Sequence, residues 1–206
     1  TCGQDMDAMM DFLKDRLVSM DLTQAQNFHD ILNAYEDLAD KFGLWDAAGV
    51  MKGYGCSDDG FIDFRAWLIA QGRDTYLSAL ADPDSLSEVI PYGDCCFETL
   101  SYVGDQAYEQ LTGKSAYDQT DRARYETLLA ELEQDIVYKG GIEFPREGPE
   151  LKQYLPRLCA AHPGWDGKTR WNVRQKEMRD LIRAGKAYDQ RQAPKKKHRS
   201  HGGEAR

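Results

Sequence analysis

The fold is decided by residues 56–72, which read CSDDGFIDFRAWLIAQG. Ser57, Asp58 and Asp59 stand at its start, where their oxygens can accept hydrogen bonds from the first N–H groups of a helix and their charge suits its positive end. Large apolar residues then follow at three- and four-residue steps: Phe61, Phe64, Trp67 and Leu68. This spacing is typical of one helical face. The stretch therefore predicts a capped amphipathic helix that ends near Gly72 and docks its apolar face into a helical bundle.

Helical spacing recurs through most of the chain. The expected helices cover residues 6–20, 23–42, 44–51, 73–81, 94–111, 121–138 and 150–161. Thr23 is the expected N-cap of the second helix and Gly43 its expected stop, while Pro156 makes the middle of the last helix doubtful. Residues 142–144 could form at most a short edge strand, and no alternating β-branched run is long enough to seed a sheet. The sequence thus predicts an all-α fold, a compact helical bundle.

Charge divides the chain into an acidic body and a basic arm. Residues 168–206 hold 13 Lys and Arg and 4 Asp and Glu, a net charge of +9, and the rest holds 13 basic and 31 acidic residues, a net charge of −18. Residues 168–192 are expected to form a basic helix, and residues 193–206, rich in Lys, His and Gly, a disordered tail. We therefore expect a helical domain with a helical extension over residues 1–161, followed by a basic helix and flexible tail over residues 162–206.

Composition argues against a membrane protein and against a disulfide-stabilised secreted domain. No stretch approaches the roughly 18 apolar residues that a membrane helix needs, and no charged-then-apolar signal segment opens the chain. The five cysteines form an odd set without repeated spacing, which favours reduced thiols over a disulfide framework: Cys2, Cys56, Cys95, Cys96 and Cys159. We expect a soluble chain in the cytoplasm with no membrane partner. Because the chain begins with Thr1 rather than Met, an N-terminal segment removed by processing is compatible with the sequence.

Six short runs along the first half of the chain carry a resemblance to a known family. They are LWDAA at 44–48, GCSDDGF at 55–61, FRAWLIAQGR at 64–73, LADPDSL at 80–86, YVGDQAY at 102–108 and LTG at 111–113. In this order they resemble the bacterial domain-of-unknown-function family 4240 over about residues 5–113. The resemblance implies a bacterial cytoplasmic domain. Because the family has no assigned reaction, the resemblance carries over no activity and no catalytic residue. Residues 114–206 resemble no family that can be named.

A polar cluster around the family motif is the candidate ligand site. Its members are Asp58, Asp59, Arg65, Trp67, Gln71 and Arg73. The two aspartates could serve as paired acids or as ligands of a hard metal ion, and the arginines and the glutamine suit an anionic small molecule. The alternative interpretation is structural: the acids cap the helix, Arg65 pairs with a carboxylate and Trp67 packs in the core. Catalytic residues, should the chain be an enzyme, stay unknown.

The sequence gives little support to other chemistry. The four histidines show no zinc-ligand spacing, and residues 53–55 lack the spacing and the preceding strand of a phosphate-binding loop. We therefore expect neither a metal site nor a cofactor. Cys95 and Cys96 take successive positions of an expected helix and so point in different directions. This favours one buried and one half-buried thiol over a redox pair.

The C-terminal tail offers a second candidate site. Lys195, Lys196, Lys197 and Arg199 resemble a nucleic-acid-binding tail, which would contact phosphates through charge with a strong dependence on salt. The alternative is a solvated tail without a partner. On these grounds the chain is predicted to be a binding or regulatory module whose partner is another protein or a polyanion. The alternative function is an enzyme that acts on an anionic small molecule at the Asp58, Asp59, Arg65 and Arg73 region.

Overall fold

The computed structural model describes residues 5–140, 148–165 and 167, and all of them belong to one compact unit. The predicted edge strand at 142–144, the basic helix at 168–192 and the tail at 193–206 lie outside the described residues. So does almost all of the predicted second part, residues 162–206, and this division of the chain stays a prediction.

Helices account for all the regular structure of the described residues, which contain no strand. The α-helices are α1 (Met6–Val18), α2 (Leu22–Leu38), α3 (Phe42–Lys52), α4 (Asp58–Ala70), α5 (Arg73–Ala81), α6 (Glu98–Thr112), α7 (Arg122–Glu133), α8 (Gly148–Tyr154) and α9 (Pro156–Ala161). Three short 3₁₀ helices join them: η1 (Pro83–Glu88), η2 (Gly93–Cys95) and η3 (Tyr117–Gln119). The predicted all-α fold is confirmed. None of the described helices combines the length and the apolar character needed to cross a membrane.

The deciding helix, α4, begins and packs as its sequence predicts. Ser57 is its N-cap, and the Ser57 hydroxyl accepts a hydrogen bond from the Gly60 N–H at 3.2 Å. Its apolar side chains are buried, with Phe61 1%, Phe64 0% and Trp67 0% exposed. Their rings form a stack with Trp45 of α3, whose centroid lies 4.6 Å from that of Phe61. These large buried rings make α4 a central part of the apolar core.

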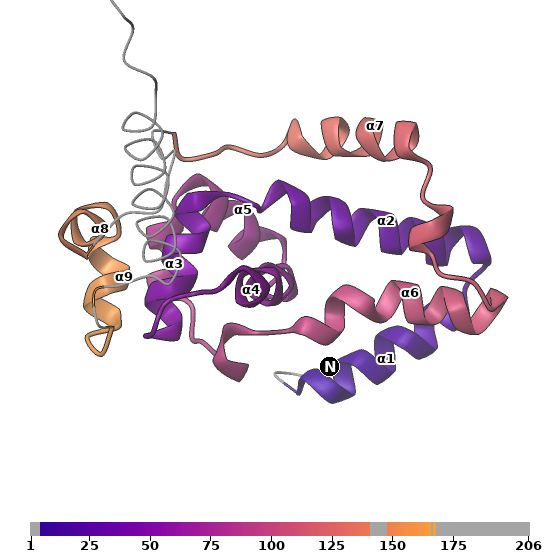
Figure 1. Cartoon of the computed structure of the whole chain (residues 1–206), viewed down its shortest axis with the longest axis horizontal. Helices are drawn as coiled ribbons and strands as arrows, with labels where there is room; N and C mark the ends of the chain where they lie inside the picture. Colours follow the sequence, from indigo (N-terminus) through magenta and orange to yellow (C-terminus); the bar gives the residue numbers. More distant parts are fainter. Residues whose placement is uncertain (1–4, 141–147, 166, 168–206) are drawn as a thin grey trace, which may run out of the picture. The chain divides into compact units, whose positions relative to one another are not determined.

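The other helices surround α4. Figure 1 shows α7, α2, α6 and α1 following one another from top to bottom, and the neighbours in this row are in contact. Helix α4, seen nearly end-on in the same view, passes between α2 and α6 and contacts both. Helices α3, α8 and α9 lie together at the other end of the unit, where α9 packs against η1 and α3.

Two boundaries around α2 and α3 differ from the prediction. The N-cap of α2 is Asp21, whose carboxylate accepts the Gln24 N–H at 2.9 Å, and the expected cap Thr23 lies inside the first turn. The helix ends at Leu38, because Lys41 adopts an extended conformation with φ −128° and ψ 135°. Gly43, the expected stop, is a buried residue of α3 instead. A nearby carboxylate two residues earlier therefore outcompetes Thr23 as the cap.

Later boundaries differ as well. Helix α6 begins at Glu98, four residues after the expected start, because Gly93, Asp94 and Cys95 all have positive φ and cannot continue a right-handed helix. Cys95 and Cys96 therefore precede α6, although one is buried and the other half-buried, as predicted. Helix α7 ends at Glu133, five residues before the expected end. Pro156 begins α9 and thereby divides the last expected helix in two.

Candidate functional site

The six residues predicted to bind a ligand lie at separate places. Asp58 and Asp59 belong to the exposed first turn of α4, whereas Arg73 begins α5, beyond the other end of α4. The 13 residues of α4 span about 20 Å at the usual helical rise. The two acids and Arg73 are therefore at opposite ends of one helix, and the helix does not bring them into a common pocket.

Arg65 connects α4 to α2. Its guanidinium donates a hydrogen bond from Nη1 to the Glu36 carbonyl oxygen at 2.9 Å, and the same nitrogen lies 3.9 Å from a carboxylate oxygen of Asp40. The guanidinium also lies over the Phe61 ring, 5.1 Å from its centroid. Only 12% of the Arg65 side chain is exposed. These contacts match the structural interpretation, in which Arg65 pairs with a carboxylate.

Trp67 and Gln71 are also engaged inside the helical unit. The Trp67 side chain is fully buried, and Gln71 donates hydrogen bonds of 2.9 Å to the Trp67 carbonyl oxygen and to the Tyr92 hydroxyl. Binding of an anionic ligand by the complete set of six residues stays a prediction. Of the six, Arg73 is the one that lines a cavity described below. The predicted nucleic-acid contacts, from Lys195 to Arg199, lie outside the described residues.

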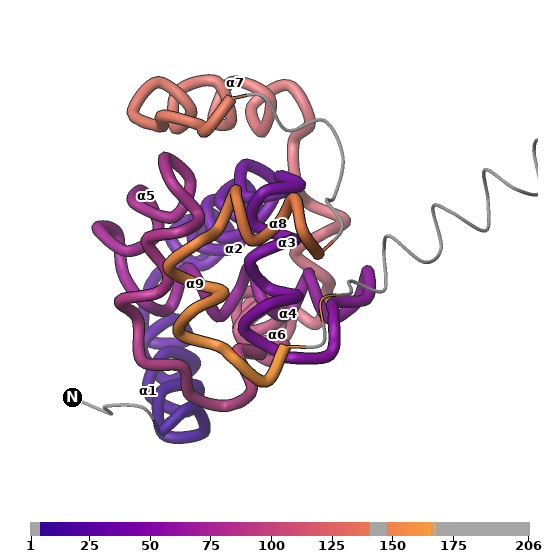
Figure 2. Tube along the Cα trace, turned by 90° about the vertical axis from the view of Figure 1, so that its left-hand side faces the viewer, coloured from indigo at the N-terminus to yellow at the C-terminus, as the bar shows by residue number. Residues whose placement is uncertain are grey.

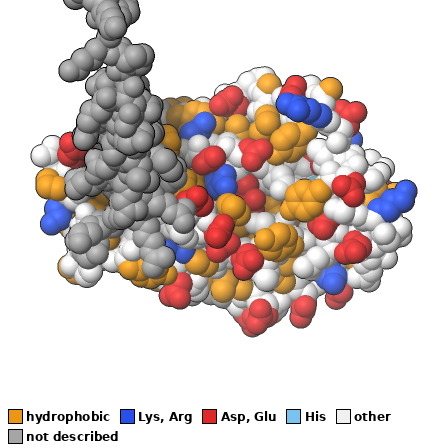
Figure 3. Space-filling view, in the orientation of Figure 1, with side chains coloured by type: hydrophobic (Ala, Val, Ile, Leu, Met, Phe, Trp, Pro, Cys, Tyr) orange, Lys and Arg blue, Asp and Glu red, His pale blue; other side chains and the backbone are white. Residues whose placement is uncertain are grey.

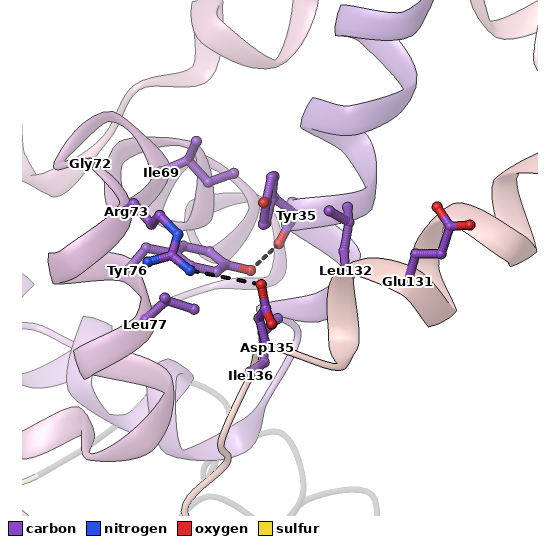
Figure 4. Close-up of a pocket in the computed structure, with 10 residues that line it drawn as sticks. All are labelled: Tyr35, Ile69, Gly72, Arg73, Tyr76, Leu77, Glu131, Leu132, Asp135 and Ile136. Carbon is purple, nitrogen blue, oxygen red and sulfur yellow. Dashed lines mark hydrogen bonds and ion pairs between the residues drawn. The ribbon is translucent and has the colours of Figure 1, made fainter.

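A cavity of about 230 Å³ lies where α5 and the C-terminal end of α7 approach α2 and α4. It is lined by Tyr35, Ile69, Gly72, Arg73, Tyr76, Leu77, Glu131, Leu132, Asp135 and Ile136. In Figure 4 the apolar and aromatic side chains form the wall, and the charged groups stand at its edge. Apolar walls with a few polar groups at the edge are the usual composition of a small-molecule site.

Two tyrosines give this wall a fixed shape. The Tyr76 hydroxyl donates a hydrogen bond to the Tyr35 carbonyl oxygen at 2.7 Å, and the two rings meet edge to face at a centroid distance of 5.3 Å. Burial raises the pKa of Tyr76, so its hydroxyl stays protonated and remains a donor at neutral pH. Because its single proton is given to α2, Tyr76 serves the cavity with its ring face.

The edge of the cavity carries one loose ion pair. Arg73 Nη2 lies 3.8 Å from Asp135 Oδ2, which is longer than an N–H···O hydrogen bond. The two side chains are 69% and 78% exposed, so water screens their attraction and the pair contributes on the order of 1 kcal/mol or less. In Figure 4 the Glu131 carboxylate points away from this pair. An incoming carboxylate can therefore replace Asp135 at Arg73 at little cost.

One wall of the cavity, α7, is weakly attached. None of its residues is buried, and both Figure 1 and Figure 2 show it on the outer side of α2. Polar contacts hold it there: the Tyr125 hydroxyl donates to the Asp37 carboxylate at 2.8 Å, and the Arg124 guanidinium donates to the Asn27 side chain. Elements with few buried apolar contacts open at low free-energy cost. Helix α7 can therefore move to admit a ligand without disturbing the core.

A second cavity of about 250 Å³ lies between the start of α3 and Tyr138, Lys139 and Tyr154. Its two lysines already have partners. Lys139 lies over the Tyr154 ring at 4.4 Å and forms a 2.7 Å ion pair with Asp82, and Lys41 lies over the Tyr138 ring at 4.4 Å. These contacts join the chain after α7 to the helical unit. We therefore regard the first cavity as the candidate ligand site.

Comparison with family models shows which cavity residues lie in a family segment. The family described as protein of unknown function (DUF4240) matches residues 1–110. The chain belongs to this family. The comparison with curated proteins and that with solved structures each gave no match. Because the DUF4240 match ends inside α6, the cavity wall from Tyr35 to Leu77 belongs to the family segment, and the wall from Glu131 to Ile136 belongs to the C-terminal extension.

Sequence reasoning identified one lining residue as a ligand contact, Arg73. Leu132 and Ile136 lie in the helix predicted over 121–138, and Tyr35 lies in the helix predicted over 23–42. A single sequence gives no indication that the apolar faces of distant segments meet around a cavity.

Proposed function

We propose that this DUF4240 protein is a binding module that takes a small molecule with an apolar body and a carboxylate into the cavity between α5 and α7. The observation that carries the proposal is the cavity itself, with aromatic and aliphatic walls and the guanidinium of Arg73 at its edge. The apolar body of the ligand would fill the space between Tyr76, Leu77 and Leu132. We further propose that the protein acts in the bacterial cytoplasm, since its described cysteines are free thiols.

Among the charged groups at the edge, which include the carboxylates of Glu131 and Asp135, the guanidinium of Arg73 is the one that suits an anionic ligand. A guanidinium offers a planar fork of donors that matches a carboxylate, and the Asp135 oxygen 3.8 Å away does not satisfy that fork. Binding rather than catalysis is proposed because the residues of the enzyme alternative, Asp58, Asp59, Arg65 and Arg73, are spread along α4 and beyond it. Movement of α7 on ligand binding would give the module a regulatory output.

The test uses 3-phenylpropionate and its uncharged analogue 3-phenylpropanol as probes, titrated into the full chain and followed by NMR. Both probes should bind saturably, and the acid should bind more tightly. Leu132→Trp, which fills the cavity, should weaken both probes by about tenfold, equivalent to roughly 1.4 kcal/mol. Arg73→Gln should remove the preference for the acid and leave the alcohol unchanged.

Two matched variants serve as controls. Leu128→Trp makes the same change on the same helix at a half-buried residue that does not line the cavity. Arg122→Gln removes an exposed arginine of α7 that pairs with Glu126. Neither should alter binding of the probes. Equal binding to the wild type and to Leu132→Trp would contradict the proposal, as would an acid preference that survives in Arg73→Gln.

A second proposal rests on charge. The basic arm, residues 168–206, carries a net charge of +9 beside a body with a net charge of −18, and Figure 3 shows acidic side chains across the described face of the unit. We propose that the arm binds a polyanion through Lys195, Lys196, Lys197 and Arg199. Because the acidic body repels a polyanion, contact would be confined to the arm and would weaken strongly with salt.

A further inference from the structure

A cluster of three thiols surrounds one lysine at the junction of α3, α4 and η2. Lys52, the last residue of α3, donates a hydrogen bond from Nζ to the Sγ of Cys96, which follows η2. Both side chains are half-buried, so the pair is in contact with solvent on one side and with protein on the other. The cluster is separate from the cavity between α5 and α7, and the proposed ligand binding does not use it.

The other two thiols of the cluster are buried. Cys56 lies directly before the N-cap of α4, and a Cβ placed on Gly60 would be 3.7 Å from both the Cys56 Sγ and the Lys52 Nζ. The ammonium of Lys52 is also close enough to Cys95 to act on its ionisation. Burial raises the pKa of Cys56 and that of Cys95 to about 12, and the Lys52 charge opposes this rise without offsetting it. Both therefore stay protonated at neutral pH.

The backbone holds Cys96 against the lysine. Gly93, Asp94 and Cys95 have φ of 56°, 54° and 54°, a left-handed run that includes two residues with side chains. Such a conformation is strained for a residue with a side chain and persists only where the surroundings impose it. Three backbone hydrogen bonds do so here: Cys95 N–H to the Tyr92 carbonyl, Cys96 N–H to the Gly93 carbonyl and Phe97 N–H to the Asp63 carbonyl.

The charges around the cluster are mixed. The pKa of Lys52 is raised overall. Burial lowers it, but the hydrogen bond to Cys96 and the nearby Cys56 and Tyr54 raise it by more, so Lys52 remains an ammonium. Asp63 lies on the adjacent face of α4, where burial and the Glu98 charge raise its pKa. Two exposed acids, Asp58 and Asp59, occupy the first turn of α4, and Asp94 precedes Cys95. Among these groups, the Lys52 ammonium is the one in hydrogen-bond contact with the Cys96 sulfur.

We propose that Cys96 is a reactive thiol and the site of reversible oxidation by a hydroperoxide. The thiolate, paired with the Lys52 ammonium, attacks the terminal oxygen of the peroxide. An S–O bond forms, the O–O bond breaks, and the departing alkoxide or hydroxide takes a proton, so the sulfur is oxidised to a sulfenic acid and the peroxide is reduced to an alcohol or water. A low-molecular-weight thiol then reverses the change by forming a mixed disulfide with loss of water, which a second thiol molecule reduces.

The test treats the reduced full chain with limiting hydrogen peroxide in the presence of dimedone and measures each labelled cysteine by peptide mass spectrometry. Cys159 of α9 is the internal comparison, because it is also half-buried and burial raises its pKa. Cys96 should be labelled on the order of tenfold faster than Cys159, because its sulfur is in contact with the Lys52 ammonium. Labelling of Cys96 at the rate of Cys159 or more slowly would overturn the proposal.

Variants of the lysine separate the effect of its charge from that of folding. Lys52→Met should slow labelling of Cys96 on the order of tenfold, and Lys52→Arg should keep most of it because the positive charge remains. Lys41→Met removes an exposed lysine elsewhere and should leave the rate unchanged. An unchanged labelling rate of Cys96 in a Lys52→Met protein with wild-type circular dichroism would also overturn the proposal.

Discussion

The carboxylate of Asp84 accepts the backbone N–H of Leu158, with a distance of 2.8 Å from Oδ1 to the nitrogen. Asp84 belongs to η1 in the DUF4240 segment and Leu158 to α9 in the C-terminal extension, so the bond joins parts of the chain 74 residues apart. The second carboxylate oxygen accepts from the N–H and the Nε of Arg157 at 3.2 and 2.9 Å. Asp84 is 4% exposed and thus supplies, from a distant segment, the cap that α9 lacks locally.

The first prediction follows from these hydrogen bonds between Asp84 and α9. Asp84→Ala leaves the two N–H groups at the start of α9 without an acceptor, which should destabilise the fold by about 1–3 kcal/mol. Equilibrium urea unfolding measures the loss. Hydrogen exchange should rise most at the N–H groups of Arg157 and Leu158, because these two groups lose their bonds to Asp84 directly.

A matched variant tests whether burial of the carboxylate matters. Glu88 also pairs with Arg157, at 3.0 Å from Nη1, but its side chain is 77% exposed. Glu88→Ala should therefore change the free energy of unfolding by less than about 0.5 kcal/mol. If the two variants lost equal stability, the bond to α9 would not be the cause.

The second prediction concerns pH and the buried carboxyl of Glu36. Burial raises the pKa of Glu36, and the hydrogen bond from Ser101 at 2.6 Å and the Arg65 charge do not offset this. A raised folded-state pKa means that the contribution of Glu36 to stability is present below its unfolded pKa and is lost as pH rises through the folded one. Glu36→Gln keeps an acceptor for Ser101, so its stability relative to wild type should be highest at pH 7 and fall towards pH 4.

Urea unfolding at several pH values measures this difference. The control is Glu109→Gln, which makes the same change of charge at an exposed position of α6. Its difference from wild type should vary less with pH. If the stability of Glu36→Gln relative to wild type rose on acidification, the direction of the Glu36 pKa shift would be wrong.

The third prediction concerns the crossing of α2 and α6. A Cβ on Gly104 would lie 2.9 Å from the Cα and from the Cβ of His29, and the Cα cannot move without displacing α2. Gly104→Ala should therefore destabilise the fold by about 1–3 kcal/mol through overpacking, although alanine favours a helix. Gln106→Ala, at an exposed position of the same helix, should stay within about 0.5 kcal/mol of wild type. Thermal and urea unfolding measure both, and a stabilised Gly104→Ala protein would contradict the observed close approach.

The parts of the fold that were predictable from sequence depend on local interactions. The start of α4 requires only Ser57 and the N–H three residues later, and its buried face requires only the spacing of Phe61, Phe64 and Trp67. The bounds of α5 follow equally from Gly72 and Asp82 at its ends. In these segments, local preference and the final fold agree.

The remainder depends on contacts between distant residues. The late start of α6 follows three consecutive positive φ values, after which the Phe97 N–H bonds to the carbonyl oxygen of the distant residue Asp63. The candidate cavity requires α7 to lie against α5, and residues 73 and 135 approach only in the folded chain. The spacing of residues along the sequence does not predict these distances. Arg73 was therefore grouped with its sequence neighbours in α4 rather than with Asp135, its partner across the cavity.

The last prediction concerns the basic arm. If the arm binds a polyanion through charge, the logarithm of its affinity for duplex DNA should fall linearly with the logarithm of salt concentration. Replacing Lys195, Lys196, Lys197 and Arg199 with glutamine removes four cations, which should lower the slope by up to about 3.6, since each neutralised phosphate contributes about 0.9. Fluorescence anisotropy across a salt series measures the slope.

The control replaces four cations of the body, Lys14, Arg16, Lys114 and Arg122, with glutamine. The body carries a net charge of −18 without the arm, so its cations stand in a repulsive field and should add little to the slope. A slope that fell equally in both variants would mean that net charge, rather than the arm, governs binding. If the arm variant left the slope unchanged, the four replaced residues of the arm would not contact DNA, because each cation that neutralises a phosphate contributes to the slope through counterion release.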